Sequence, residues 1–340
     1  MNGFFDWLFD PVADMVKDFK NSHSNDIDNL DLPTEKREME FAPAPKTKIF
    51  RPQIFEEYIG QEKAKNKLIS YINAMQKREA TMPHILIHGK AGCGKTTLAR
   101  IIANELQVKF KEQITSNADI AYIDSDIEEV EGGILFRDEI HAMPREDAEQ
   151  IYTIMEDFTH NGEPIEQFTL IGATTELGEI IKSRRPFFDR FKIKIKLEDY
   201  TNEDISEIVK QYKMNTFPND TINENIYTII GKNSRSTPRI AISLLEATIY
   251  LEGNIQQVLE NDNIIKDGYT DEDLKILEYI AKNEKGVGLQ GLVSYLDTSS
   301  ENYNYQIEPY LLKNGLVIRT PRGRKITQEG IDKIKELKNV

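Results

Sequence analysis

Short apolar runs alternate with amphipathic stretches between residues 46 and 197. The runs His84–His88, Gly133–Phe136 and Thr169–Ala173 are almost entirely apolar. Runs of this length are typical of strands buried on both faces of a parallel sheet. Strands that alternate with amphipathic helices predict βαβ units and an α/β fold for this part of the chain.

The pattern changes to helices alone over residues 201–262. Apolar residues recur at helical spacing in Asn202–Tyr212 and in Ile240–Leu251. No strand pattern interrupts them, so we expect a small helical domain after the α/β part.

The last 70 or so residues, from Thr270, carry a third pattern. It predicts helices over 271–282, 288–295 and 301–313, followed by short strands around Val317 and Ile326 that are joined by a turn at Pro321–Gly323. Three helices followed by a hairpin is the organisation of a winged helix.

The first 45 residues differ from the rest, with 10 acidic and 4 basic side chains. Residues 22–45 are polar and read as a tether. Ahead of them, apolar residues recur at helical spacing from Phe4 to Phe19, and aspartates fall every fourth residue on another face. This segment is either a helix packed on its own protein or a docking helix for an unknown protein; its acidic face disfavours an anionic membrane.

Composition excludes several classes of protein. The 340 residues contain 39% hydrophobic and 29% charged residues, which is globular composition, and the length favours two or three domains. No apolar run reaches the 18 or so residues of a membrane span, so no membrane association is expected. The single cysteine, Cys93, cannot form an internal disulfide, which indicates a reducing compartment and a cytoplasmic protein.

The net charge of −14 argues against loose coating of nucleic acid, but the charge is unevenly distributed. Residues 309–340 hold 8 basic and 3 acidic side chains, a net of +5. Four basic residues flank the Pro-Gly turn, and we expect them to project from a hairpin tip toward phosphates or a minor groove: Arg319, Arg322, Arg324 and Lys325. The alternative is a solvated hairpin without a partner.

One segment carries a phosphate-binding motif. Residues 89–97, Gly-Lys-Ala-Gly-Cys-Gly-Lys-Thr-Thr, fit G-x-x-x-x-G-K-[ST] directly after an apolar strand and before an apolar helix. Glycines let backbone N–H groups converge on phosphate, the lysine neutralises phosphate oxygens, and the first threonine offers a hydroxyl to Mg²⁺. The predicted ATP-binding residues are Gly89, Gly92, Gly94, Lys95, Thr96 and Thr97. Cys93 is interpreted as a small filler of the loop.

An acidic pair follows about forty residues later. The apolar run from Ile134 ends in Asp138 and Glu139, an arrangement in which one carboxylate orders the Mg²⁺ water shell and its neighbour polarises the attacking water. Mg²⁺ would then be held by Thr96 and Asp138. Thr174 and Thr175, at the end of a third apolar run, would lie beside the γ-phosphate.

These segments carry a resemblance to the RuvB family, the bacterial AAA+ motors of Holliday-junction branch migration. The resemblance runs from Arg51 to about Thr327, about four fifths of the chain, and leaves the first 45 residues unmatched. The matching segments include RPQIFEEYIGQ (51–61), GKAGCGKTTLARIIANEL (89–106), LFRDEIHAMPR (135–145), FTLIGATT (168–175), FFDRF (187–191), SRSTPRIA (234–241) and EPYLLKNGLVIRTPRGR (308–324).

The resemblance implies a fold and further site residues. It implies an AAA+ P-loop NTPase with a RecA-like parallel sheet, a helical lid and a C-terminal winged helix. The implied domains are an acidic tail (1–45), a nucleotide-binding domain (46–197), a lid (198–265) and a winged helix (266–340). Tyr58 and Ile59 would flank the adenine, and Arg239 would be the second sensor. Arg190 would be the arginine finger that reaches a neighbouring subunit's site, so the active unit would be a homo-oligomeric ring, a hexamer.

Two departures from the family pattern stand out. Only nine residues separate Phe158 from Phe168, where the family carries a longer hairpin that docks on RuvA, so the insertion is interpreted as a turn and a RuvA-type partner is doubtful. Arg137 replaces an apolar strand residue directly before Asp138. A buried charge needs a partner, and alternation along the strand points Arg137 away from the nucleotide.

The expected function is ATP-driven translocation of duplex or four-way-junction DNA, in the manner of the RuvB family, with ATP and Mg²⁺ as cofactors. The departures fit a relative encoded by a phage or mobile element. Two alternatives remain: an ATP switch resembling a clamp or helicase loader, and a protein-remodelling ATPase with a changed partner. The basic wing argues against the second of these.

Overall fold

The computed structural model describes residues 49–114, 123–160, 162–283 and 285–339. The amphipathic segment and tether predicted within residues 1–45 therefore lie outside the described residues.

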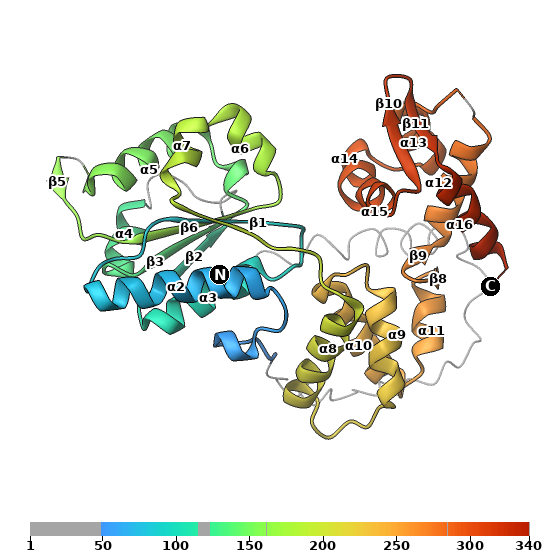
Figure 1. Cartoon of the computed structure of the whole chain (residues 1–340), viewed down its shortest axis with the longest axis horizontal. Coiled ribbons are helices and arrows are strands. Elements are labelled where there is room, and N and C mark those ends of the chain that lie inside the picture. Colours follow the sequence, from blue (N-terminus) through green and yellow to red (C-terminus); the bar gives the residue numbers. More distant parts are fainter. Residues whose placement is uncertain (1–48, 115–122, 161, 284, 340) are drawn as a thin grey trace, which may run out of the picture. The chain divides into compact units, whose positions relative to one another are not determined.

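A five-stranded parallel sheet forms the centre of the first part of the chain that the structure describes (Figure 1). Its spatial order is β2 (Phe110–Ile114), β3 (Ile134–Asp138), β6 (Thr169–Thr174), β1 (Ile85–His88) and β7 (Ile193–Lys196). The three predicted strands are confirmed as the buried centre of the sheet. The strands β2 and β7, which form the two edges, were not among the predicted elements.

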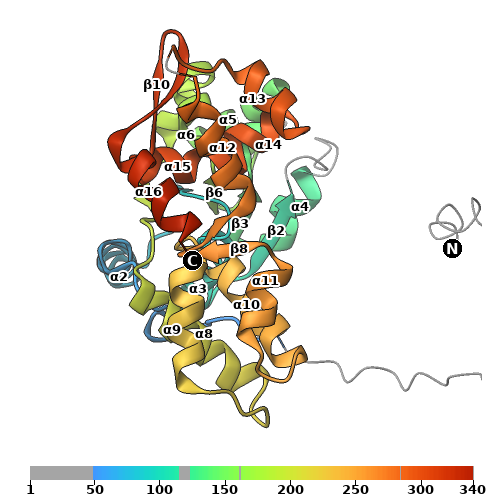
Figure 2. The same cartoon turned by 90° about the vertical axis from the view of Figure 1, so that its right-hand side faces the viewer.

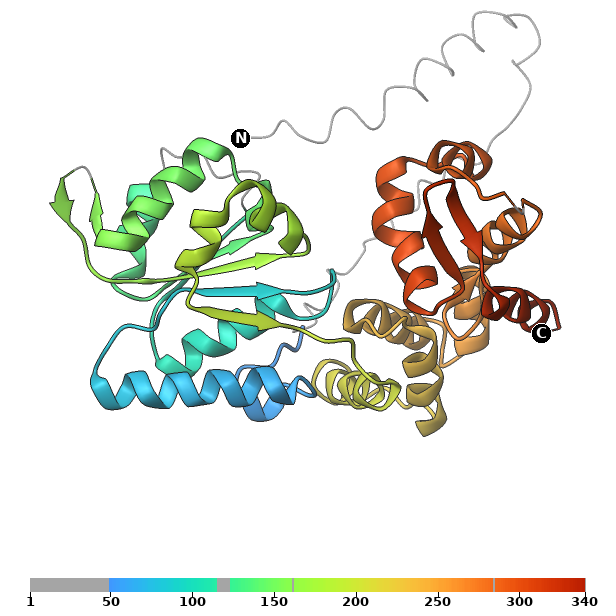
Figure 3. The same cartoon turned by 45° about the horizontal axis from the view of Figure 1, so that its top comes forward.

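Helices cover both faces of the sheet, as Figure 3 shows. One face carries α2 (Glu62–Arg78) and α3 (Lys95–Leu106), which bury Leu68, Leu98 and Ile101 against the strands. The other face carries α5 (Arg145–Asp157), α6 (Leu177–Ser183) and α7 (Arg185–Arg190). The helix α4 (Ile123–Val130) contacts β2 and β3. Short helical turns η1 (Phe55–Glu57) and η4 (Ile140–Ala142) complete this part.

The insertion after α5 is a small hairpin rather than the turn that its length suggested. Thr159–His160 (β4) pairs with Glu163–Pro164 (β5) in an antiparallel ladder of two residues on each side. Nine residues are thus enough for two cross-strand pairs, because Gly162 adopts a positive φ of 84° at the turn.

Four helices follow the sheet and pack on one another (Figure 2). They are α8 (Asn202–Thr216), α9 (Glu224–Asn233), α10 (Pro238–Tyr250) and α11 (Ile255–Asn261). The first begins with a capping box, in which Thr201 and Asp204 exchange side-chain and backbone hydrogen bonds. The predicted helical segment is confirmed.

The C-terminal part is a winged helix. After the short pair β8 (Ile264–Lys266) and β9 (Tyr269–Thr270) come α12 (Asp271–Ala281), α13 (Leu289–Leu296), α14 (Ser300–Asn302), η5 (Tyr303–Ile307) and α15 (Glu308–Lys313). The hairpin of β10 (Val317–Thr320) and β11 (Gly323–Ile326) follows, then α16 (Gln328–Lys338), which was not among the predicted elements.

The helix predicted over 301–313 contains a π turn at η5. Pro309, in the first turn of α15, has no N–H to donate, so the regular i→i−4 ladder is interrupted there. The rest of the predicted helices and the hairpin are confirmed, and so is the overall class: a parallel α/β sheet, a helical segment and a winged helix. Among the described residues, no helix has both the length and the apolarity to cross a membrane.

Candidate active site

The phosphate loop connects β1 to α3 at the carboxyl edge of the sheet, where parallel strands place their ligand-binding loops. Two of its glycines adopt left-handed backbone angles, with φ of 72° at Gly92 and 96° at Gly94. A Cβ at Gly94 would lie 2.8 Å from the Tyr58 hydroxyl, and one at Gly92 would lie 2.9 Å from Arg239 Cβ. Only glycine satisfies both the backbone angle and the space at these positions.

Two tyrosines support the loop from behind. The buried Tyr200 hydroxyl lies 3.3 Å from the Tyr58 hydroxyl and 3.2 Å from the Cys93 carbonyl oxygen, and Tyr58 Oη donates to the Gly94 carbonyl at 3.4 Å. Burial raises the pKa of Tyr200 to about 12 and also raises the pKa of Tyr58 well above its ordinary value. Both hydroxyls therefore stay protonated and brace the loop as neutral groups.

The predicted phosphate and metal ligands lie together. Lys95 is buried at the start of α3, and its Nζ donates to the carbonyls of Gly89 and Lys90, each at 3.1 Å. The Thr96 hydroxyl faces the carboxylate of Asp138 across 3.5 Å. A hydroxyl and a carboxylate beside a lysine and a nest of backbone N–H groups are the donor set that a Mg²⁺-nucleotide needs.

Glu139 forms hydrogen bonds with Thr175, the residue directly after β6. The Thr175 hydroxyl donates to Glu139 Oε2 at 3.0 Å, and the Thr175 backbone N–H does so at 3.3 Å. Thr174 is fully buried; its Oγ1 lies 3.0 Å from Nδ1 of His141, which the sequence reasoning had not singled out. The acidic pair and the threonines predicted from separate segments thus meet at one edge of the sheet.

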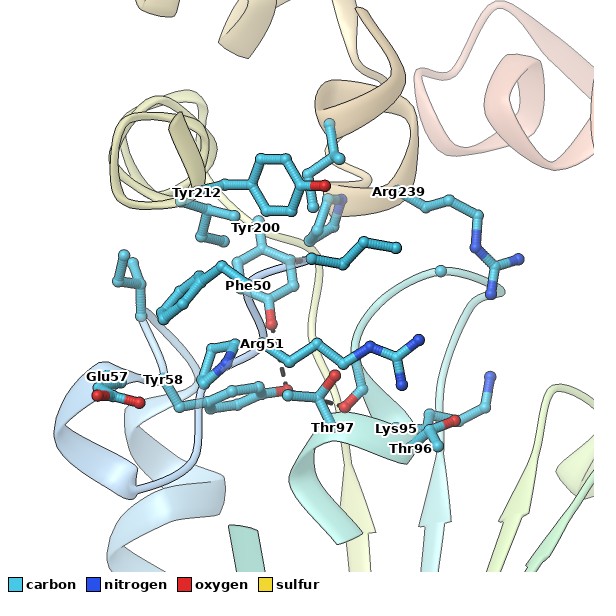
Figure 4. Close-up of a pocket in the computed structure, with 18 of the residues that line it drawn as sticks. Phe50, Arg51, Glu57, Tyr58, Lys95, Thr96, Thr97, Tyr200, Tyr212 and Arg239 are labelled. Carbon is cyan, nitrogen blue, oxygen red and sulfur yellow. Dashed lines mark hydrogen bonds between the residues drawn. The ribbon is translucent and has the colours of Figure 1, made fainter. Parts of the chain in front are cut away.

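A cavity of about 510 Å³ opens beside the phosphate loop (Figure 4). Most predicted ATP-site residues line it: Tyr58, Ile59, Gly92, Gly94, Lys95, Thr96, Thr97, Asp138, Glu139 and Arg239. Gly89, Thr174, Thr175 and Arg190 do not line it. Further lining residues were missed, among them Phe50, Arg51, Tyr200, Ile208 and Tyr212. They come from distant segments with no common motif, so no sequence signal joined them.

Comparison with known proteins agrees with this geometry. Residues 50–197 match the family model described as the Holliday junction DNA helicase RuvB P-loop domain, and residues 266–335 match the RuvB C-terminal winged helix domain. The chain belongs to the RuvB family.

Full-length relatives support the assignment. The RuvB subunit of the Holliday junction branch migration complex from Latilactobacillus sakei is 35% identical over 86% of this chain and 93% of its own length. Its counterpart from Leuconostoc mesenteroides is 38% identical over 82% of this chain and 86% of its own.

Solved structures give the same family. The structure of Thermotoga maritima RuvB, a Holliday junction branch migration motor, has a TM-score of 0.73 and 34% identity, and covers 85% of this chain and 99% of its own. Aeropyrum pernix ORC2, at 14% identity and a TM-score of 0.53, shares the fold alone.

Arg190 lies at the end of α7 in this RuvB-family chain. Its guanidinium donates to the Tyr152 hydroxyl at 2.8 Å, lies over the Tyr152 ring and pairs with Glu156 of α5. The side chain is 28% exposed and does not reach the cavity of its own chain.

Arg137 has the partner that its burial requires. It points to the sheet face opposite its neighbours in β3, and its Nη2 donates to Asp126 of α4 at 3.0 Å. Its Nε and Nη1 have no hydrogen-bond partner among the described residues.

The basic residues of the wing differ in their surroundings, which corrects the expectation that all four project from the tip. Arg319 and Arg324 form a cross-strand pair below the tip, and both bind the fully buried carboxylate of Glu308. Burial alone would raise the pKa of Glu308, but hydrogen bonds from the two arginines outweigh it and lower that pKa. Arg322 lies in the turn itself, and Lys325 in β11.

Proposed function

We propose that this chain hydrolyses ATP and uses the energy to move duplex DNA through a ring of subunits at Holliday junctions. The observation that carries the proposal is the convergence of Lys95, Thr96, Asp138 and Glu139 on one cavity in a chain of the RuvB family. The curated relatives are named as subunits of a Holliday junction branch migration complex, which favours the motor over a loader-like switch or a protein-remodelling factor.

The residues fit ATP with Mg²⁺. Lys95 and the loop glycines would hold the phosphates, and Thr96 with Asp138 would hold Mg²⁺, whose charge offsets that of the phosphate oxygens. Glu139 would accept a proton from the attacking water as the water oxygen bonds to the γ-phosphorus. The bond between that phosphorus and the β–γ bridging oxygen then breaks, which releases ADP and phosphate.

The remaining site residues would sense the nucleotide. Tyr58 and Ile59 line the cavity where the base would lie, and Arg239 enters it from α10. Thr174 and Thr175 would respond to the γ-phosphate through Glu139. Arg190 would complete a neighbouring subunit's site, which makes a closed ring, a hexamer, the active unit.

DNA would bind the wing. Arg322, which lies in the turn between β10 and β11, is the leading candidate for a phosphate contact. Lys325 in β11 and the partly exposed Arg319 in β10 are the next candidates. Arg324 is 13% exposed and held by Glu308, so its first effect would be to shape the wing.

Partner proteins are proposed to differ from the family pattern. The hairpin of β4 and β5 offers a RuvA-type partner only two residues on each strand, so that partnership is doubtful. We expect residues 1–45 to supply a docking contact for another protein. We expect the protein to act in the cytoplasm. Deletion of residues 1–45 would then abolish binding of that partner and leave ATP hydrolysis intact.

The test is steady-state ATPase activity without DNA, with linear duplex and with a synthetic four-way junction, at one moderate salt concentration and without RuvA. We expect stimulation by DNA that is greatest with the junction, and branch migration of the junction when ATP is present. No stimulation by any DNA, in a preparation that binds ATP, would contradict the proposal.

A further inference from the structure

We infer that His141 is a positioning residue for ATP hydrolysis, which fixes the carboxylate of Glu139 and couples it to Thr174. The inference rests on the proposed function of Glu139 as the base, and it concerns a residue for which that proposal has no role.

The His141 imidazole contacts both the carboxylate of Glu139 and the hydroxyl of Thr174. His141 Nδ1 is 3.2 Å from Glu139 Oε2 and 3.0 Å from Thr174 Oγ1. A carboxylate oxygen can only accept, so the tautomer that carries its hydrogen on Nδ1 is the one that can donate toward Glu139. Thr174 Oγ1 accepts from the backbone N–H of Glu176 at 2.9 Å, which fixes its direction. In that tautomer of His141, one N–H group faces both the end of β3 and the end of β6.

The contacts of Glu139 are one-sided. Thr175 and His141 approach Oε2, whereas no residue in the described part of the chain donates a hydrogen bond to Oε1. A base needs one oxygen held and the other available to a water molecule, because free rotation of the carboxylate would spread the acceptor over many directions. Glu139 is 41% exposed and lines the cavity, so the available oxygen can meet water there.

The backbone delivers His141 to this place. Glu139 adopts a left-handed conformation, with φ of 47° and ψ of 49°, which is unfavourable for a residue other than glycine and persists only where the surroundings impose it. The turn η4 starts from there, and its first residue, Ile140, is fully buried. Ile140 packs over Gly172 of β6, where a Cβ would come within 2.7 Å of it. The packing of Ile140 thus places the next side chain beside Thr174.

The outer side of the ring has a weaker contact. His141 Nε2 lies 3.5 Å from Glu176 Oε1, and the ring is 18% exposed. Because the two ring nitrogens of His141 have different partners, substitutions can distinguish the role of Nδ1 from that of Nε2. The amide nitrogen of asparagine occupies the position of Nδ1, and that of glutamine occupies the position of Nε2.

The experiment compares His141→Asn, His141→Gln and His141→Ala in the full chain, with kcat measured per ATP-binding site. We expect His141→Asn to keep kcat within about 3-fold of the parent. His141→Gln and His141→Ala should lose at least about 10-fold in kcat, with KM for ATP within about 2-fold, as expected for loss of a transition-state interaction. A residue that only supports folding would change the number of binding sites, not the turnover of each.

Three outcomes overturn the inference: all variants within 2-fold of the parent, a glutamine variant more active than the asparagine variant, or a rise in turnover. A Glu139→Gln variant is measured in parallel. If it still turns over ATP, the proposed function of Glu139 fails; if it is inactive and binds ATP, a failure in the His141 series concerns His141 alone.

Discussion

Arg137 and Asp126 form an ion pair whose side chains are only 3% and 2% exposed, and Arg137 directly precedes Asp138, the proposed Mg²⁺ ligand. Burial lowers the pKa of Arg137 and raises the pKa of Asp126, so each partner offsets only part of the cost of removing the other's charge from water. The pair links α4 to the sheet on the face away from the nucleotide.

This pair predicts a stability effect with little loss of turnover. Asp126→Ala removes the hydrogen-bonded partner of a buried guanidinium, which keeps only the charge of Asp147 nearby, and should lower the free energy of unfolding by about 3–5 kcal/mol. The double variant Arg137→Met with Asp126→Leu should recover most of that loss, because both charges are gone. Chemical denaturation measures both. Equal stability of the single variant and the parent would contradict the structure, and kcat of the double variant should stay near that of the parent.

His84 predicts acid sensitivity. Its Nδ1 accepts from the Leu170 N–H at 2.9 Å and its Nε2 lies 3.3 Å from the Met155 carbonyl, so the folded protein holds the neutral ring. Burial lowers the pKa of His84 from 6.5 to about 4. The unfolded chain therefore binds the proton first, and as pH falls from about 6.5 to 4 about 3 kcal/mol of stability is lost.

The measurement for His84 is the free energy of unfolding as a function of pH between 4 and 7. His84→Asn, whose Oδ1 can accept from Leu170 but cannot titrate, is the control. We expect a shallower slope in the control than in the parent over this range. If the free energy of unfolding of the parent and of His84→Asn depended on pH in the same way, groups other than His84 would cause the loss of stability in acid.

The wing predicts different effects for two arginines. Arg322→Ala should weaken DNA binding and reduce the slope of log affinity against log salt by about one, because one phosphate contact is lost. Arg324→Ala should lower stability by about 2–3 kcal/mol, since Glu308 loses charge-assisted hydrogen bonds in a buried place. Filter binding over a salt series and thermal unfolding separate the two. An unchanged salt slope in Arg322→Ala would remove the turn from the DNA interface.

Arg190 predicts complementation between subunits. Arg190→Ala and Glu139→Gln should each abolish hydrolysis while sparing ATP binding. In an equal mixture, about a quarter of the interfaces would join an intact Glu139 to a neighbour's intact Arg190, and ATPase activity should return to that extent. Turnover by Arg190→Ala alone, or no recovery in the mixture, would contradict action across the interface.

Local chemistry explains what could be predicted from the sequence. The phosphate loop is one contiguous motif, because its glycines and Lys95 would hold the same phosphates and Thr96 the Mg²⁺ bound to them, and the strand before it is almost entirely buried. The need of Arg137 for a partner also followed from its place in an apolar strand, but the identity of Asp126 did not. The fold brings residues of different helices and strands into contact, and a single sequence does not show which of them will meet.

The wing and the cavity show the same limit. Glu308 lies eleven positions before Arg319 and in another element, so nothing in the basic hairpin itself indicated that two of its arginines bind inward. Tyr200 follows β7 and belongs to no motif. Its role as a support of the phosphate loop follows only from its distances to Cys93 and Tyr58. His141 lies in one of the segments that resemble the family, but its proposed positioning role depends on its contact with Thr174 of β6.

The pairing of Arg190 with Glu156 and Tyr152 has a consequence for assembly. In a single subunit the guanidinium already has an anion, so the proposed transfer to a neighbour's nucleotide would exchange one anion for another. The free energy gained would be the difference between pairing with a carboxylate and pairing with a terminal phosphate, and it would be greater for ATP than for ADP because the γ-phosphate adds charge. Linkage would then make the association constant of the subunits depend on the nucleotide, and the affinity for ATP depend on subunit concentration.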